Sequence, residues 1–252
     1  MMVKTGLIGG SGLEKLNIFL DAEEIQIETP FGQPSSSILR GNVGKSEVFI
    51  ISRHGRSHSI TPTHVNNRAN IWALKEAGCD QIIATTACGS LREDIRRGDL
   101  VILDQFIDFT RLRINTFWDH FEEGKIAHTA MADPFSKELR QLLIQSAQQM
   151  GLSFHPKGTV ITIEGPRFST RAESILFRSF GADVINMSIA PEAALANELG
   201  IKYAAIALST DYDSWKQDEE PVTWDIIVQV FKENVKHVTS LLVNVLNAIE
   251  NK

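Results

Sequence analysis

Apolar and polar positions alternate along this chain in blocks that have the lengths of single strands and helices. Apolar runs that predict buried strands cover residues 4–8, 47–52, 81–90, 100–108, 158–164, 182–188 and 203–208, and the runs at 24–32 and 36–41 predict exposed strands. Segments with a helical period cover residues 66–77, 136–150, 170–180, 191–199 and 223–249. This alternation of strands and helices predicts an α/β fold.

Several of the expected helices carry end signals. Gly78 follows the first helix, Thr170 and Glu173 form a capping box at the start of the third, and Pro191 lies in the first turn of the fourth. No internal repeat or low-complexity linker interrupts the 252 residues. We therefore expect a single domain, residues 1–252.

Two carboxylates follow the apolar run at 203–208, with Asp211 and Asp213 separated by one residue. In an extended backbone both side chains point to the same side, beyond the carboxyl end of a strand, where open α/β sheets bind ligands. Like charges on one face repel each other unless a donor lies between them. A ligand with an exocyclic amine and a protonatable ring nitrogen meets that need. The alternative is that Asp211 caps a turn and Asp213 is solvated.

Other strand ends suit an anion. The first strand runs into a glycine-rich turn containing Ser11, which lets backbone N–H groups approach an anion but lacks the third glycine of the dinucleotide fingerprint, so a plain tight loop is the alternative. Arg53 and His54 follow the run at 47–52 and suit a bidentate grip on phosphate. Thr86 and Ala87, at the exit of the run at 81–90, let backbone amides approach a ligand.

Three further side chains suggest contact with an organic ligand or a neighbouring subunit. Phe168 follows a Gly-Pro turn and is exposed unless it stacks on a flat group such as a purine. Met187 offers adaptable apolar surface for a sugar, with core filling as the alternative. His128 lies in a long aperiodic segment at 110–133, which predicts a functional loop or an interface, although a lone loop histidine is usually solvated.

Composition excludes several other classes of protein. The net charge of −6 and the scattered cations do not favour nucleic-acid or membrane binding, and no apolar run approaches the length of a membrane span. We expect a cytoplasmic protein. His54, His58 and His64 lack the spacing of a metal site, and Cys79 and Cys88 show neither zinc-site nor disulfide spacing.

Taken in order, these motifs resemble the purine nucleoside phosphorylase superfamily, and in particular its trimeric methylthioadenosine phosphorylases. The matching segments are 8–12, 53–56, 69–78, 85–92, 104–108, 162–169, 183–188 and 210–215. The resemblance implies a mixed, twisted β-sheet flanked by helices and a homotrimer. It also implies phosphorolysis of S-methyl-5'-thioadenosine to adenine and 5-methylthioribose 1-phosphate, in purine and methionine salvage, with inorganic phosphate as co-substrate and no cofactor.

The resemblance also implies a role for individual residues. Phosphate would be held by Ser11, Arg53, His54, Thr86, Ala87 and Ser188. Met187 would lie against the ribose, Phe168 and Ser169 at the base, and His128 would reach the 5' pocket of a neighbouring subunit.

Asp211 and Asp213 would then be the catalytic pair. Cleavage of a glycosidic bond builds positive charge on the sugar and negative charge on the leaving base. Asp211 would share a proton with purine N7 as general acid, and Asp213 would accept from the 6-amino group. A 6-oxopurine would leave these groups unpaired, which disfavours an inosine or methylthioinosine phosphorylase as the alternative.

The sequence departs from the family pattern at the 5' pocket. Trp224 and, one turn later, Ile227 stand where smaller aliphatic residues are expected. This leaves the preference among methylthioadenosine, 5'-deoxyadenosine and adenosine open. A hydrolytic nucleosidase is disfavoured by Arg53 and His54, and a non-catalytic binding protein is disfavoured because each group that the mechanism needs is present.

Overall fold

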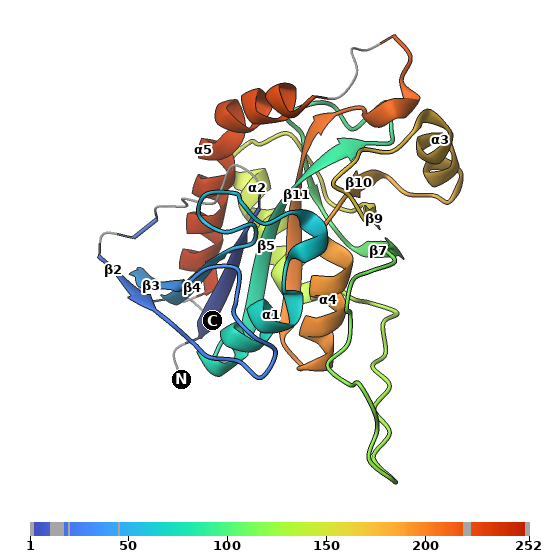
Figure 1. The fold of residues 1–252 in the computed structure, drawn as a ribbon. Coiled ribbons are helices and arrows are strands. Elements are labelled where there is room, and N and C mark those ends of the chain that lie inside the picture. Colours follow the sequence, from blue (N-terminus) through green and yellow to red (C-terminus); the bar gives the residue numbers. More distant parts are fainter. Residues whose placement is uncertain (1–2, 11–17, 20, 45, 219–222, 250–252) are drawn as a thin grey trace.

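The computed structural model describes residues 3–10, 18–19, 21–44, 46–218 and 223–249, with only the backbone given for 224–228, 231 and 233. A large mixed sheet is flanked by helices, which confirms the predicted fold class (Figure 1). The strands are β1 (Lys4–Gly9), β2 (Ala22–Ile25), β3 (Ile38–Val43), β4 (Ser46–Ser52), β5 (Gln81–Ser90), β6 (Leu100–Ile102), β7 (Gln105–Phe109), β8 (Phe154–His155), β9 (Thr159–Ile163), β10 (Val184–Asn186) and β11 (Lys202–Asp211). The helices are α1 (Asn67–Glu76), α2 (Lys137–Gln149), α3 (Arg171–Ser179), α4 (Ile189–Glu198) and α5 (Trp224–Ile249), with short 3-10 turns η1 (Pro62–His64) and η2 (Asp213–Trp215).

The sheet is organised around β5. Its strand order is β2-β3-β4-β1-β5-β10-β9-β7, and β11 also pairs with β5 and leads on to β6 and β8. The first half of β5 pairs in parallel with β1, its last residues pair antiparallel with β10, and β11 runs parallel along nearly its whole length. Because three strands share β5, its carboxyl end meets polar residues from several directions.

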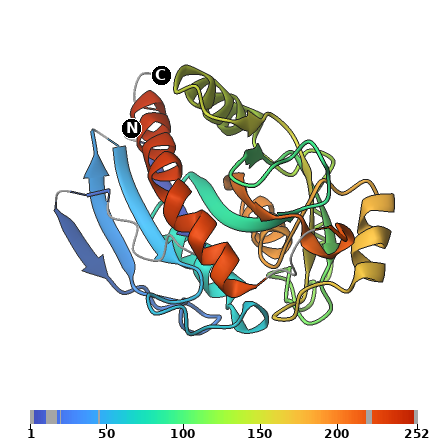
Figure 2. The same ribbon diagram turned by 90° about the horizontal axis from the view of Figure 1, so that it is seen from above.

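Helices cover the sheet on both faces (Figure 2). Leu142 of α2 and Leu242 of α5 share one apolar cluster with Ile83, whereas Leu74 of α1 belongs to a second cluster with Ile82. Adjacent β5 residues thus enter opposite clusters, as expected for a strand whose side chains alternate between two covered faces. Among the described residues, no helix combines the length and the apolar character needed to cross a membrane.

The helix end signals are confirmed. The Thr170 side chain accepts from the Glu173 N–H while the Glu173 carboxylate accepts from the Thr170 N–H, which is the expected capping box of α3. Asn66 and Ser136 cap α1 and α2 with their side chains. Gly78 follows α1 with φ of 87°, a left-handed conformation that favours glycine.

Two predicted strands are wrong in extent. The run at 100–108 is two strands, because β6 pairs antiparallel with β11 whereas β7 pairs in parallel with β9. Between them Asp104 exchanges backbone and side-chain hydrogen bonds with Gly158, so the chain changes partner there. The exposed run at 24–32 keeps strand structure only to Ile25, and Thr29–Gly32 form a turn in which the Gly32 N–H donates to Thr29 O.

Candidate active site

A cavity of about 330 Å³ lies at the carboxyl ends of β4, β5 and β11. Both carboxylates, the Arg53-His54 pair and the predicted apolar contacts line it together. Its predicted lining residues are Arg53, His54, Thr86, Ala87, Phe168, Ser169, Met187, Ser188, Asp211 and Asp213. The chain thus brings together side chains that are up to 160 positions apart in sequence.

The two acids converge by a different geometry from the one predicted. Asp211 is the last residue of β11, after a bulge between Ser209 and Asp211, and it pairs with Gly89 of β5. Asp213 is not in extended backbone but begins η2 with φ of 46°. The prediction that both acids project from one extended strand is therefore wrong, since a bulge and a turn aim them into the cavity.

Hydroxyl and amide donors surround both carboxylates. Thr210 Oγ1 donates to Asp211 at 2.7 Å, and the Asp213 N–H donates to Asp211 at 2.8 Å. Ser169 Oγ lies 2.7 and 2.6 Å from the two oxygens of Asp213. Burial nevertheless dominates, and it raises the pKa of Asp211 to about 6 and the pKa of Asp213 above its ordinary value.

The Arg53 guanidinium is held inside the chain. It is 1% exposed, and its Nε and Nη2 both contact the Glu192 carboxylate, which is fully buried. Arg53 Nη1 donates to the Thr85 carbonyl at 2.8 Å. The predicted phosphate contact therefore belongs to a buried, bidentate ion pair.

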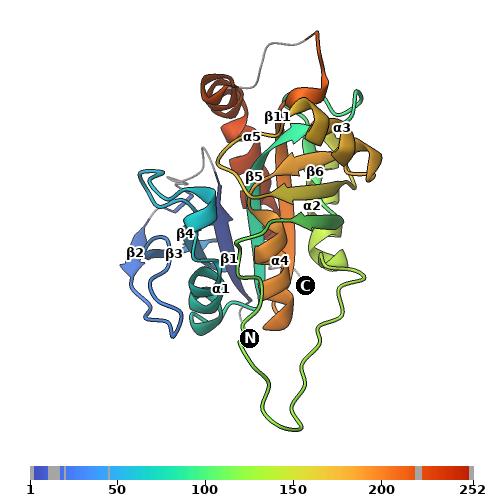
Figure 3. The same ribbon diagram turned by 45° about the vertical axis from the view of Figure 1, so that its right-hand side comes forward.

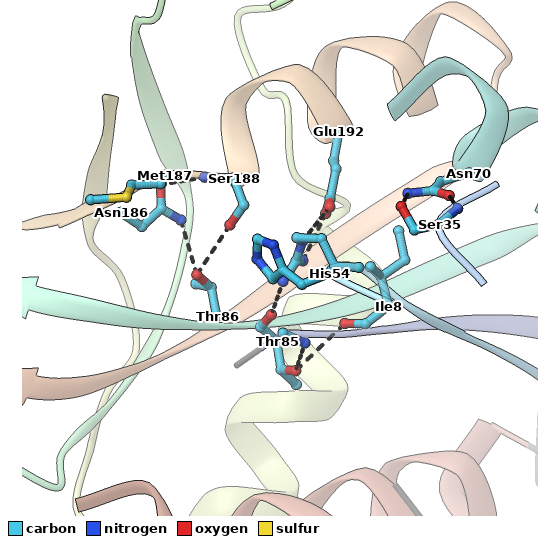
Figure 4. A network of polar contacts seen from close by, with 12 residues as sticks. Ile8, Ser35, His54, Asn70, Thr85, Thr86, Asn186, Met187, Ser188 and Glu192 are labelled. Carbon is cyan, nitrogen blue, oxygen red and sulfur yellow. Dashed lines mark hydrogen bonds and ion pairs between the residues drawn. The ribbon is translucent and has the colours of Figure 1, made fainter. Parts of the chain in front are cut away.

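Hydroxyl and amide groups continue from this ion pair into the cavity (Figure 4). Thr86 Oγ1 lies 3.2 Å from Ser188 Oγ, and Asn186 Nδ2 donates to Thr86 Oγ1 at 3.3 Å. The His54 ring lies beside Thr86 and Ser188 in Figure 4, and its Nδ1 is 2.9 Å from the Ile60 carbonyl. Together they form a polar wall of hydroxyl, amide and imidazole groups, which are able to reorient their protons toward an oxyanion.

The two acids and Arg53 lie beside different residues along β5. Asp211 pairs with Gly89, whereas Arg53 contacts the carbonyl of Thr85, four residues earlier on the strand. Four residues of strand span roughly 13 Å. The cavity is thus bipolar, with an acidic end at Asp211 and Asp213 and a basic end at Arg53 and His54.

Hydrogen bonds from a buried arginine, Arg113, hold the part of the cavity wall that lies between the two ends. Arg113 donates to Glu164 Oε1 at 2.8 Å and to the Met187 carbonyl at 2.9 Å, and its side chain is only 2% exposed. Glu164 also accepts from the N–H groups of Arg111 and Leu112. Met187 lines the cavity, and Phe168 stands at its rim with 38% of its surface exposed.

Four predicted site residues are not placed in this cavity. His128 is exposed in the segment that projects beyond the sheet (Figure 3), where its ring lies 5.7 Å from that of Phe121. Ser11 lies outside the described residues. Trp224 and Ile227 begin α5, but their side chains lie outside the described part of the chain.

No group of three or more metal-ligating side chains occurs among the described residues. Cys88 lines the cavity, but burial raises its pKa well above the ordinary value for a thiol. Its predicted role as a core residue rather than a nucleophile is consistent with this protonated state.

Sequence reasoning missed Glu192, Asn186 and Arg113. Glu192 lies in the first turn of a helix, where an acid is expected to stabilise the helix dipole, and no local pattern relates it to an arginine 139 residues earlier. Asn186 ends a strand, as do the residues that were singled out, and that position was an available signal. Arg113 lies in an aperiodic segment, which offered none.

The chain matches known proteins over nearly its whole length. A family model described as the phosphorylase superfamily matches residues 4–247. S-methyl-5'-thioadenosine phosphorylase of Xenopus tropicalis is 51% identical over 250 residues, which cover 98% of this chain and 89% of the relative. The enzyme of the same name from Thermofilum pendens is 49% identical over 98% of this chain and 92% of its own length.

Solved structures match as closely. Methylthioadenosine phosphorylase from Schistosoma mansoni, in complex with adenine, superimposes with a TM-score of 0.95 at 42% identity, covering 99% of this chain and 93% of that chain. A mutant of the adenosine/methylthioadenosine phosphorylase from the same organism, in complex with methylthioadenosine, has a TM-score of 0.94 at 41% identity and covers 99% of this chain and 92% of that chain.

Proposed function

Because the chain belongs to the phosphorylase superfamily, we propose that its bipolar cavity binds a nucleoside between the acidic and the basic end. The protein is a pentosyltransferase, and its reaction is phosphorolysis of S-methyl-5'-thioadenosine, the activity for which its relatives are named. The 6-oxopurine alternative is not favoured by these relatives.

The basic end binds inorganic phosphate in this proposal. Arg53, His54, Thr86 and Ser188 surround one part of the cavity, with the backbone at Ala87 beside them. Charge-assisted hydrogen bonds from a guanidinium and neighbouring hydroxyls are the usual ligands of a phosphate. Ser11 is assigned to the same site from the family resemblance. A phosphate held here directs one oxygen at the anomeric carbon of the sugar.

The acidic end binds the purine. Phosphate oxygen forms a bond to C1' as the C1'–N9 bond breaks, and the bonding electrons leave with the base. Asp211 gives its proton to N7, so the base departs neutral, and Asp213 accepts from the 6-amino group. Phe168 and Ser169 flank the base, and Met187 lies against the ribose.

The observation that carries this proposal is the placement of the buried Asp211, whose pKa is raised to about 6, at the end of the cavity away from Arg53. A carboxyl group with this pKa is partly protonated near neutral pH and is therefore able to act as an acid. A general acid of this kind contributes about 10² to 10⁴ in rate.

The remaining features of the proposal rest on the family resemblance. We assign no resident cofactor, a single domain, a cytoplasmic enzyme and a homotrimer in which His128 reaches the 5' pocket of a neighbour. Exposed apolar side chains on the projecting segment, Leu112, Trp118, Phe121 and Ile126, support a contact between copies. Trp224 and Ile227 are assigned to the pocket for the 5' substituent.

Base release tests the function directly. The purified protein is incubated with methylthioadenosine, adenosine or methylthioinosine, each with and without inorganic phosphate. The proposal expects adenine release that depends on phosphate and is fastest with methylthioadenosine. Release without phosphate would indicate a nucleosidase, and preferred release of hypoxanthine would mean that the roles of Asp211 and Asp213 are wrong.

A further inference from the structure

We infer that Glu192 is a positioning residue for the phosphate site, acting through Arg53. The inference rests on the proposed binding of phosphate at the basic end of the cavity. Glu192 does not line the cavity among the described residues; it lies in the first turn of α4 (Figure 4), and its carboxylate contacts Arg53.

The contact fixes the plane of the guanidinium. Arg53 presents Nε and Nη2 to the two oxygens of Glu192, and Nη2 lies 2.9 Å from Oε2. Nη1 is directed at the Thr85 carbonyl, 2.8 Å away. These three contacts, two with α4 and one with β5, hold the guanidinium against rotation about the bonds of its own side chain. Its orientation toward a ligand is thus set before the ligand arrives.

The same carboxylate is itself held in place. Tyr203, from β11, donates its hydroxyl to Glu192 Oε2 at 2.7 Å, and its side chain is 1% exposed. Residues of β5, α4 and β11 therefore meet at this one ion pair, together with Arg53, which directly follows β4. The arginine of the phosphate site is thus held by three elements of the core.

The charge balance has a second consequence. A guanidinium that is 1% exposed requires a counter-charge whenever the phosphate site is empty. Glu192 supplies it, so phosphate meets a neutral pair with a fixed donor edge rather than an isolated cation. Phosphate is then selected by hydrogen-bond geometry more than by net charge.

Two substitutions separate geometry from charge. Glu192→Gln keeps the shape and removes the charge. Its amide N–H group also replaces one carboxylate oxygen, so that a donor faces the Arg53 guanidinium where an acceptor stood. Glu192→Asp keeps the charge and withdraws the carboxylate by one methylene. If Glu192 positions Arg53, both variants raise the KM for phosphate about tenfold, the scale of a lost hydrogen bond to a charged group, and leave the KM for the nucleoside within twofold.

A gentler variant and a matched control complete the test. Tyr203→Phe removes only the hydroxyl that holds Glu192, and it raises the phosphate KM about threefold. Glu198→Gln changes a carboxylate on the same helix that binds Thr116 Oγ1 at 2.7 Å, and it leaves the phosphate KM unchanged. If a Glu192 variant does not fold, the phosphate KM of Tyr203→Phe alone tests the inference.

Four outcomes distinguish the possibilities. Raised phosphate KM in the Glu192 and Tyr203 variants supports the inference. A lower phosphate KM in Glu192→Gln would overturn it, because Glu192 would then weaken phosphate binding by its charge alone. An unchanged phosphate KM would also overturn it, provided that the unmodified protein requires phosphate. If the unmodified protein releases adenine without phosphate, the proposed function itself is wrong.

Discussion

The two ends of the cavity bury charge in opposite ways. Arg53 is compensated within the chain by Glu192. Asp211 and Asp213 accept hydrogen bonds from hydroxyls and backbone N–H groups, and the attraction between Arg97 and Asp211 is weaker than the effect of burial. A buried cation in a bidentate ion pair keeps its charge, whereas buried acids for which burial dominates shift their pKa upward.

This difference assigns a task to each end. A group whose charge never changes suits the binding of an anion that arrives and leaves as an anion. A group whose pKa lies near the working pH suits proton transfer, and the pKa of Asp211 is raised to about 6. The comparison predicts that substitutions at one end change proton transfer and nucleoside binding while leaving phosphate binding intact.

The largest expected effect is that of Asp211→Asn on turnover. The amide cannot donate an acidic proton to N7, so kcat falls about 100- to 10,000-fold while the phosphate KM stays within twofold. Steady-state kinetics with methylthioadenosine and varied phosphate measure both values. The variant should also prefer adenine nucleosides less strongly over hypoxanthine nucleosides.

Unchanged kinetics with both classes of nucleoside would contradict the role of Asp211. A fall in kcat accompanied by a large rise in the phosphate KM would instead contradict the separation of the two ends, since the acidic end would then support phosphate binding as well.

Asp211→Asn should also make the folded protein more stable than the unmodified protein, by an amount that grows as the pH rises. The pKa of Asp211 is raised by burial to about 6, so its contribution to stability is fully present below about pH 4 and is lost as pH rises through 6. The loss amounts to about 3 kcal/mol of the free energy of unfolding. The asparagine side chain does not titrate, so the advantage of Asp211→Asn grows over this range. Urea unfolding at pH 4.5 and pH 8 measures it, and an advantage that does not change with pH would show that the pKa is not raised.

Two glycines allow a symmetrical test of the ends. A Cβ on Gly89 would lie 2.9 Å from Asp211 Oδ1 and 3.1 Å from Asp213 Cβ. A Cβ on Gly10 would lie 2.5 Å from both Arg53 Nη1 and the Thr85 carbonyl oxygen. Each site therefore depends on a glycine for close packing, and overpacking of this kind costs about 1 to 3 kcal/mol.

We expect Gly89→Ala to raise the nucleoside KM about tenfold, a shift that such a cost accounts for, and to spare the phosphate KM. Gly10→Ala should do the reverse. Initial-rate measurements with each substrate varied in turn distinguish the two variants. If both variants affect both substrates equally, the ends are coupled through β5 and the comparison fails.

The sequence predicted which residues meet but not how they are held. Strand ends with polar residues identified Arg53, Thr86 and Asp211, because parallel strands place their carboxyl ends at one edge of a sheet. The bulge after Ser209 and the positive φ of Asp213 were not predictable from local sequence, since Asp211 pairs with Gly89 and Asp213 accepts from Ser169, both far away along the chain. The buried partners Glu192 and Arg113 were missed for the same reason.

The fold shows the same division. Helix boundaries such as Thr170 and Gly78 follow from local chemistry and were predicted to within a residue. The division of 100–108 into β6 and β7 depends on β11 and β9, which lie far along the chain, and local periodicity contains no information on that choice. The positions of helix ends therefore follow from the local sequence, whereas the choice of pairing partner for each strand does not.

The smallest effect predicted at the acidic end, that of Ser169→Ala, distinguishes the roles of its two carboxylates. Ser169 Oγ donates to Asp213, and this hydrogen bond lowers a pKa that burial raises. Without the hydroxyl the pKa of Asp213 rises further, which disfavours the carboxylate form that accepts from the 6-amino group. The nucleoside KM should rise about fivefold, as expected for one hydrogen bond, and return toward the unmodified value as the pH increases. Measuring the nucleoside KM of both proteins over a series of pH values tests this. A constant ratio of the two KM values across the series would mean that Ser169 contacts the base only, and that Asp213 is ionised without its help.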